Sequence, residues 1–206
     1  MCQVASVTAA ARNGRVRFST MVLIAAIAGF SVLAAAVDGD DVPLYRGVYL
    51  NRAYGFSVAI PGGLVGKGVR PPNPNHGFII RLGSAKTKDG VMQLNDRYIW
   101  VDGSYPPVDQ VQSISDLKGY ALSVIRETVG STFEEKSMRD VELAGLSGTS
   151  VVSTFTTGGT HMIDEEIVAL GAKAMYTIGL RTTPSDERMD REIFRRVVAG
   201  FRVLKN

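Results

Sequence analysis

Cysteine and histidine are nearly absent from this 206-residue chain. The single cysteine is Cys2, so the residues after it can form no disulfide, no thiolate metal site and no cysteine nucleophile. The two histidines, His76 and His161, leave few options for acid–base catalysis or for a zinc site, which needs at least three protein ligands. We therefore predict a protein without a bound metal ion or other cofactor.

The sequence also lacks an excess of charge outside its first residues. It has 23 basic and 20 acidic side chains, and the only charged residues before Val37 are Arg12, Arg15 and Arg17. Residues 37–206 therefore carry 20 charges of each sign. Sequence-independent binding to nucleic acid needs clustered Lys and Arg that neutralise phosphates. This balance gives no reason to expect a nucleic-acid partner.

An N-terminal export signal is predicted by the order of charged and apolar residues. The arginines precede residues 21–36, which are sixteen residues without a charge. Spanning a bilayer takes about 20 apolar residues, so this run is slightly short for an anchor. Ala34 and Ala36 are small residues that signal peptidase accepts, and we expect residues 1–36 to be removed. The remaining chain would be periplasmic or secreted and free of the membrane; an uncleaved anchor with the same topology is the alternative.

Residues 37–206 contain no repeat, low-complexity run or long linker, so we interpret them as one domain. Alternating apolar residues predict strands over residues 54–61, 77–82 and 97–102. Between the first two strands, residues 62–76 hold four glycines and three prolines. That composition predicts a long surface loop.

A helix is predicted between Ser115, which suits an N-cap, and Gly130, which suits a C-terminal stop. Four runs rich in Thr, Val, Ile and aromatic residues follow it, separated by glycine-containing turns. Short turns force neighbouring strands to be antiparallel, so this pattern predicts a β-meander. The four runs are residues 133–141, 147–156, 161–170 and 172–181.

The C-terminal segment has the period of a helix, with Ser185 as its predicted N-cap. Its predicted apolar side consists of Met189, Ile193, Phe194, Val197, Val198 and Phe201. Four arginines fall largely on the other side, which we interpret as a solvated face: Arg188, Arg191, Arg195 and Arg196. Strands and helices are segregated along the chain. The predicted fold class is therefore α+β, an antiparallel β-sheet covered by helices.

Four segments of the sequence together resemble the PsbP-like domains. They are Tyr54–Pro61, Ser113–Leu117, Val141–Thr149 and Ile193–Val203, and the similarity in element order spans most of residues 45–204. The resemblance implies an α/β/α sandwich with helices on both sides of a sheet. It also implies a bacterial exported relative of accessory proteins that bind partners without catalysis. No functional residue is carried over from that family.

One set of residues could in principle form a hydrolytic site. His76, Asp102 and Ser104 could act as base, orienting acid and nucleophile of a serine-type hydrolase. The sequence Asp102-Gly-Ser104 is also typical of a turn that ends a strand, and we prefer that interpretation. We therefore predict no catalytic residue, and the hydrolase is kept as the less favoured alternative.

The acidic segment His161–Glu166 is the strongest candidate for a metal site. Successive side chains of a strand alternate between faces, so Asp164 and Glu166 point away from Glu165. Adjacent carboxylates on opposite faces cannot jointly hold one ion, and other ligands would have to come from elsewhere. We interpret these carboxylates as the solvated polar edge of a hairpin.

Aromatic residues near the third predicted strand are candidates for partner binding, because Trp and Tyr dominate the anchors of protein interfaces. On a strand, Tyr98, Trp100 and Asp102 share one face, which could equally lie under a helix. His76 lies in the predicted loop 62–76, a segment of the kind that often carries function. The candidate partner-binding residues are His76, Tyr98, Trp100, Asp102 and Tyr105.

These observations favour a non-enzymatic, exported binding or accessory domain of the bacterial cell envelope. Its expected partner is another envelope or secreted protein, bound through residues 62–76 and the aromatic edge 98–107. One alternative is an inhibitor or immunity protein directed against a secreted enzyme. The serine-type hydrolase is the other.

Overall fold

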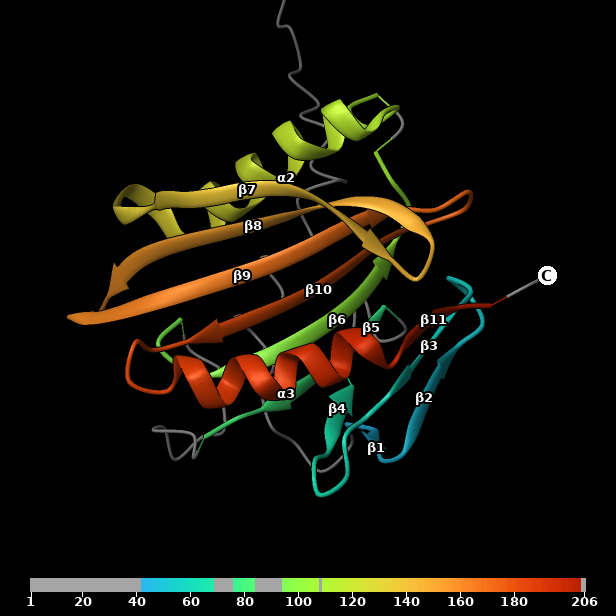
Figure 1. Ribbon diagram of the computed structural model, residues 1–206, viewed down its shortest axis with the longest axis horizontal. Coiled ribbons are helices and arrows are strands. Elements are labelled where there is room, and N and C mark those ends of the chain that lie inside the picture. The colour runs from blue at the N-terminus through green and yellow to red at the C-terminus, as the bar shows by residue number, and fades with distance from the viewer. Residues whose placement is uncertain (1–41, 69–75, 84–93, 108, 205–206) are drawn as a thin grey trace, which may run out of the picture.

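Two antiparallel sheets and two long helices form the fold in the computed structural model, which describes residues 42–68, 76–83, 94–107 and 109–204. The larger sheet has the strand order β1-β4-β5-β6-β10-β9-β8-β7, and the smaller sheet has the order β11-β3-β2 (Figure 1). In chain order the elements are β1 (Leu44–Tyr45), β2 (Val48–Asn51), β3 (Phe56–Ala59), β4 (Gly66–Gly68), β5 (Gly77–Arg81), β6 (Tyr98–Ser104), α2 (Ile114–Val129), η2 (Gly130–Thr132), β7 (Glu134–Leu143), β8 (Leu146–Thr157), β9 (Thr160–Leu170), β10 (Met175–Thr182), α3 (Glu187–Ala199) and β11 (Phe201–Val203).

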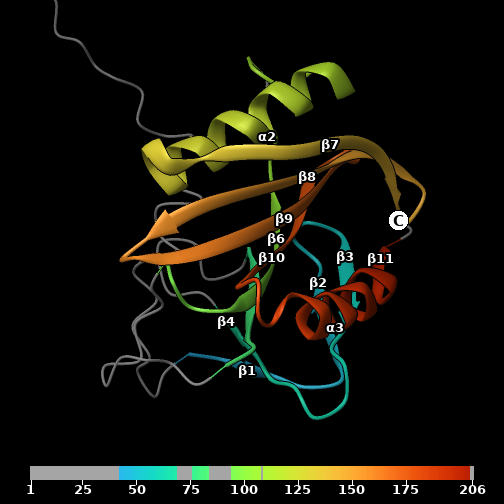
Figure 2. The ribbon, with the colours of Figure 1, turned by 60° about the vertical axis from the view of Figure 1, so that its left-hand side comes forward.

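The two helices cover opposite faces of the larger sheet. α2 packs on β8 and β9, whereas α3 packs on β10 from the other side. The smaller sheet lies beside α3 on that second side, as Figure 2 shows. The predicted α+β fold, an antiparallel sheet covered by helices on both sides, is therefore confirmed. The smaller sheet is a layer that the sequence did not predict.

The predicted β-meander is formed by β7, β8, β9 and β10, each antiparallel to the next. Positive backbone φ angles mark both of its tight hairpin turns, at Ala144 and Gly145 and again at Gly158 and Gly159. Two successive residues with positive φ form the kind of turn whose twist matches the flanking strands. The glycine turns thus fix the order of these strands.

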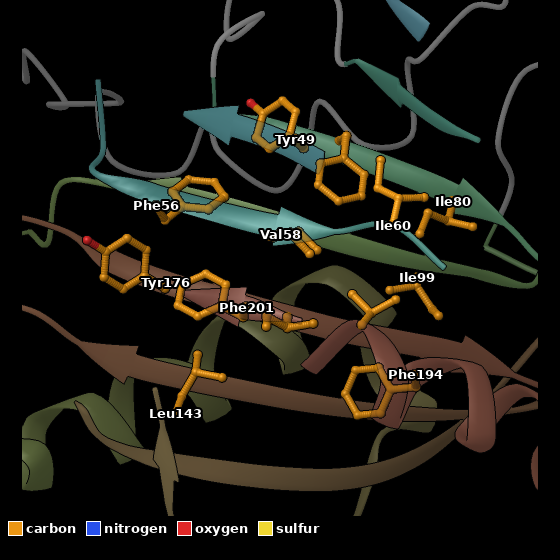
Figure 3. Packing of buried hydrophobic residues seen from close by; sticks show 14 of the residues in the cluster. Tyr49, Phe56, Val58, Ile60, Ile80, Ile99, Leu143, Tyr176, Phe194 and Phe201 are labelled. Atoms are coloured by element: carbon orange, nitrogen blue, oxygen red, sulfur yellow. The ribbon is translucent and has the colours of Figure 1, made fainter. Parts of the chain in front are cut away.

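The main core fills the space between the larger sheet, α3 and the smaller sheet (Figure 3). Aromatic rings dominate it: Phe56 of β3 stacks on Phe201 of β11, with ring centroids 5.6 Å apart, and Tyr176 of β10 packs edge-on against both. Because each ring removes a large apolar area from water, this cluster fixes the smaller sheet on the larger one.

A second core lies between the larger sheet and α2. The buried face of α2 consists of Leu117, Ala121, Ile125 and Val129, which recur at the spacing of one helical face. They pack against Val151, Phe155, Met162, Val168 and Met175 of the meander. Within the described residues, neither helix combines the length and the apolar character that crossing a bilayer requires.

Both predicted helix caps were wrong by one or two residues. α2 is capped by Ser113, whose Oγ accepts a hydrogen bond from the backbone N–H of Asp116 at 3.2 Å. Asp186, and not Ser185, precedes the first turn of α3, and its carboxylate accepts bonds from Thr183 and Ser185 instead of capping the helix. Gly130 ends α2 as predicted.

The predicted apolar side of the C-terminal helix needs two corrections. Met189 is 56% exposed, and its neighbour Asp190 takes the buried position because it pairs with Arg97. Phe201 does not belong to the helix, since α3 ends at Ala199 and Phe201 begins strand β11. The predicted solvated face is also incomplete, because Arg191 is half-buried and pairs with Glu165.

The segment 62–76, predicted to be a loop, is not loop throughout. Residues Gly66–Gly68 form strand β4, which pairs with β1 on one side and β5 on the other. Short side chains permit this, because a Cβ at Gly66 would lie 2.8 Å from the ring of Phe78. Residues 69–75 of that segment and the predicted signal peptide 1–36 lie outside the described residues.

Candidate functional site

Four side chains from three parts of the chain gather where β5 and β6 approach the turn between β2 and β3. They are Tyr54, His76, Asp102 and Tyr105, which we call the His76 cluster. The hydroxyl of Tyr54 lies 2.9 Å from Nε2 of His76, and Nδ1 of His76 lies 3.9 Å from Oδ1 of Asp102. The ring of Tyr105 packs 5.1 Å from that of Tyr54 and is 68% exposed.

Tyr54 is held by its backbone as well as by its ring. Its N–H donates to Oδ1 of Asn51 at 3.1 Å, and its carbonyl accepts a bond from the hydroxyl of Tyr176 at 2.8 Å. On the neighbouring strand, a Cβ at Gly103 would lie 2.9 Å from the Cβ of Tyr54. Glycine at position 103 therefore lets the tyrosine pack directly on β6.

His76 and Asp102 are brought together by the register of β5 and β6. Gly77 pairs with Asp102, and the N–H of Gly103 donates to the carbonyl of His76 at 2.8 Å. A Cβ at Gly77 would lie only 1.8 Å from the carbonyl oxygen of Val101, so no larger residue fits this crossing. The backbone thus fixes where the imidazole and the carboxyl start.

Partial burial changes the proton affinity of both ionisable groups. The side chains of His76 and Asp102 are 25% and 28% exposed. Burial lowers the pKa of His76 and raises the pKa of Asp102 to about 7. At neutral pH the imidazole is therefore uncharged and Asp102 is partly protonated. The cluster presents aromatic rings, a hydroxyl and a carboxyl that changes charge near pH 7.

The geometry argues against the hydrolase alternative. One ring nitrogen of His76 is bonded to the hydroxyl of Tyr54 and the other faces Asp102, so Ser104 takes no part in this chain of contacts. A serine nucleophile needs the imidazole as its hydrogen-bonded base. The tyrosine cannot replace it, because burial raises the pKa of Tyr54 and keeps its hydroxyl protonated.

The structure divides the five predicted partner-binding residues into two groups. His76, Asp102 and Tyr105 lie in the His76 cluster, whereas Tyr98 and Trp100 are buried on the α2-facing side of the larger sheet. Sequence reasoning missed Tyr54, which it placed only as the start of a strand. Its position after Asn51 and before Gly55, in a turn, was the available signal.

Tyr98 and Trp100 belong to a second group of polar residues, which we call the buried polar layer. Its other members are Asp164, Glu166 and Arg181. Nε and Nη2 of Arg181 donate to the two carboxylate oxygens of Asp164 at 2.8 and 2.5 Å. The guanidinium also lies 4.8 Å from the ring centre of Phe155 and 5.4 Å from that of Tyr98.

The interpretation of Asp164 and Glu166 as a solvated hairpin edge was therefore wrong. Both side chains are buried, because β9 is an inner strand with β8 and β10 on its two sides and α2 packed on it. Burial and the neighbouring carboxylate of Asp164 raise the pKa of Glu166 to about 8. Among the described residues, no three His, Cys, Asp or Glu side chains are grouped so that they could hold a metal ion.

Comparison with known proteins shows the fold alone. No protein-family model matches the sequence, and a search of curated proteins found no match. Cyanobacterial PsbP (CyanoP) from Synechocystis shares 16% identity, with a TM-score of 0.55 over 78% of this chain and 92% of that one. A Bacteroides thetaiotaomicron protein shares 10% identity, with a TM-score of 0.50 over 78% of this chain and 49% of that one.

A third solved structure, the Ran-binding protein Mog1p of Saccharomyces cerevisiae, has 9% identity and a TM-score of 0.48, covering 79% of this chain and 97% of its own. The similarity to CyanoP shows that the fold of this chain is PsbP-like, as the resemblance in the sequence implied. A fold of this kind is compatible with a non-catalytic binding domain. It does not identify a partner, because one fold hosts many functions.

Proposed function

We propose that this chain is an exported, non-catalytic binding domain of the cell envelope that holds a protein partner through the His76 cluster. The observation that carries the proposal is the exposed ring of Tyr105 packed on the fixed ring of Tyr54. An interface anchor gains most when its ring is already held in place, because little conformational freedom is then lost on binding.

The polar members of the cluster add specificity around that anchor. His76 offers an imidazole whose Nε2 is already bonded to Tyr54, and Asp102 offers a carboxyl beside it. Because the pKa of Asp102 is raised to about 7, its charge changes across the range in which envelope proteins work. A partner that presents a basic side chain here would bind more tightly above pH 7 than below it.

The absence of catalysis is part of the same proposal. It is supported by the arrangement of His76, whose two ring nitrogens face Tyr54 and Asp102 and leave Ser104 without a base. The PsbP-like fold agrees with it, as does the shortage of histidine and cysteine in the sequence. Export rests on residues 1–36, and N-terminal sequencing of the protein from its native host tests it: a mature chain beginning at Val37 supports export with cleavage.

Affinity capture from an envelope extract tests the binding proposal. Three tagged chains are compared: the wild type, Tyr105→Ala and Met189→Ala. Met189 is a matched control, because it is also a large exposed apolar residue but lies on α3. We expect a stoichiometric partner that the wild type and Met189→Ala retain and that Tyr105→Ala loses. A partner retained equally by all three chains would refute the role of the His76 cluster.

A further inference from the structure

Three buried hydrogen-bonding groups on the α2-facing side of the larger sheet have no partner. They are Nε1 of Trp100, Nη1 of Arg181 and Oγ of Ser153. All three residues are at most 3% exposed. Leaving a buried donor unsatisfied costs about 1–3 kcal/mol, so such groups call for an explanation. Their position in the sheet supplies one.

The guanidinium of Arg181 is fixed on three sides. Asp164 binds its Nε and Nη2, and the rings of Phe155 and Tyr98 flank its carbon atom. Asp164 lies on β9, between the strands that carry the two rings. Nη1 is therefore the one nitrogen of this group that remains for another acceptor, and it is held above the middle of the sheet.

The indole of Trp100 reaches the same region from β6. Its ring lies over Gly179 of β10, where a Cβ would be 2.0 to 2.3 Å from three indole atoms. Gly179 pairs on its other side with Glu166 of β9. The indole thus extends across β10 in the row that contains Glu166. Since Glu166 follows Asp164 by two residues on the same face, it lies roughly 7 Å along the strand from the Arg181 pair.

The charges of this region favour an incoming acceptor. Asp164 neutralises Arg181, and the pKa of Glu166 is raised to about 8, so the glutamate is an uncharged acid at neutral pH. The charged and titratable groups that act on Glu166 are Asp164, Arg181 and Tyr98, while the residues of α2 buried against the sheet are apolar. Two N–H groups and one O–H group therefore face the site without an opposing negative charge.

We propose that the α2-facing side of β9 and β10 binds one small oxyanion, of the size of formate or acetate, through Nε1 of Trp100, Nη1 of Arg181 and the carboxylic acid of Glu166. Oxyanions accept several hydrogen bonds at once, and bonds to a charged group inside a protein are about twice as strong as neutral ones. The site is separate from the His76 cluster and does not depend on the proposed partner.

Binding of an anion here depends on pH in a defined direction. Above pH 8 Glu166 loses its proton, and the resulting carboxylate repels the ligand. Affinity is therefore expected to fall by at least tenfold between pH 6.5 and pH 9. Glu166→Gln keeps a donor at this position without a titratable proton, so this variant binds the ligand at both pH values.

The single tryptophan of the sequence makes the test direct. The ¹⁵N-labelled protein has one indole N–H resonance, which is followed by NMR while formate or acetate is added at constant ionic strength with sodium chloride. We expect a saturable shift of this resonance at pH 6.5 and a much weaker response at pH 9. No shift, or the same shift with sodium chloride alone, would overturn the proposal.

Two variants separate the site from a nonspecific salt effect. Trp100→Phe keeps a ring but lacks the N–H, and its affinity for formate, measured by calorimetry, should be at least tenfold lower. Glu166→Gln should retain the indole shift at pH 9. If Trp100→Phe binds formate as the wild type does, or if Glu166→Gln keeps the pH dependence of the wild type, the assignment is wrong.

Discussion

The indole ring of Trp100 lies directly over the backbone of Gly179 on the neighbouring strand β10. The nearest ring atom, Cζ2, would be only 2.0 Å from a Cβ at that position. A glycine in the middle of an inner strand is therefore required here by packing. It also explains how the largest side chain of the sequence can be buried against a sheet in which every neighbouring position is occupied.

Replacing this glycine should destabilise the protein. In Gly179→Ala the new methyl group overlaps the indole, which must leave its position, and we expect a loss of about 2–4 kcal/mol in the free energy of unfolding. Gly119→Ala is the matched control, because nothing lies within 4 Å of a Cβ there and alanine favours a helix by about 0.8–1 kcal/mol over glycine. Urea denaturation of both variants measures the difference. Equal stabilities would contradict the packing described.

Asp190 joins α3 to the larger sheet through a buried ion pair. Its carboxylate accepts bonds from Nε and Nη2 of Arg97 at 2.8 and 2.7 Å and from the hydroxyl of Thr182 at 2.5 Å. Asp190→Ala leaves these donors unpaired, and we expect a loss of about 3–5 kcal/mol. The adjacent Met189→Ala should change stability by less than about 0.5 kcal/mol, because Met189 is exposed. Similar effects of the two substitutions in thermal denaturation would show that the pair does not hold the helix.

Glu166 makes stability depend on pH. Its pKa rises from 4.5 in the unfolded chain to about 8 in the fold, so between these values the folded state binds a proton that the unfolded state has lost. Stability contributed by this group is present below pH 4.5 and is lost as the pH rises toward 8. In Glu166→Gln this loss is absent. The variant should therefore be more stable than the wild type at pH 8, by an amount on the order of a few kcal/mol, and the gap should close near pH 4.5.

Denaturant titrations of the wild type and Glu166→Gln at pH 4.5, 6 and 8 check this. Asp102, whose pKa is raised to about 7, gives a slope of the same sign in both proteins, so the difference between them isolates Glu166. A constant difference across the three pH values would mean that the carboxyl is not protonated in the fold.

The hydrogen bond between Tyr54 and His76 should stabilise the cluster measurably. Tyr54→Phe removes a hydroxyl that lies 2.9 Å from Nε2 of His76, and a bond of this kind contributes about 1 kcal/mol. Tyr105→Phe is the control, because the structure gives that exposed tyrosine a ring contact to Tyr54. Chemical denaturation should distinguish the two variants. A larger loss in Tyr105→Phe would contradict the described contacts.

The elements that the sequence predicted well are those whose signal is local. Glycine pairs such as Gly158 and Gly159 specify a tight turn, and the meander follows from them. The helical period located both helices for the same reason. The smaller sheet was missed because β11 is three residues long and pairs with β3, more than 140 positions away in the sequence. Nothing in a short segment records such a pairing.

The site was predictable only in part, for a related reason. The strand period placed Tyr98, Trp100 and Asp102 on one face but could not say what covers that face. Charge was the more misleading signal, since Asp164 and Glu166 were taken to be solvated. Their burial depends on Arg181, which the meander brings into register with Asp164 and which sequence reasoning assigned no role.

The claim that the His76 cluster is the binding surface is tested most directly by crosslinking in the native host. A photo-reactive amino acid is placed at position 105 in one chain and at position 189 in another, and the adducts are identified by mass spectrometry. The account predicts one abundant envelope or secreted protein crosslinked from position 105 and absent from position 189. The same adducts from both positions, or adducts from position 189 alone, would contradict it.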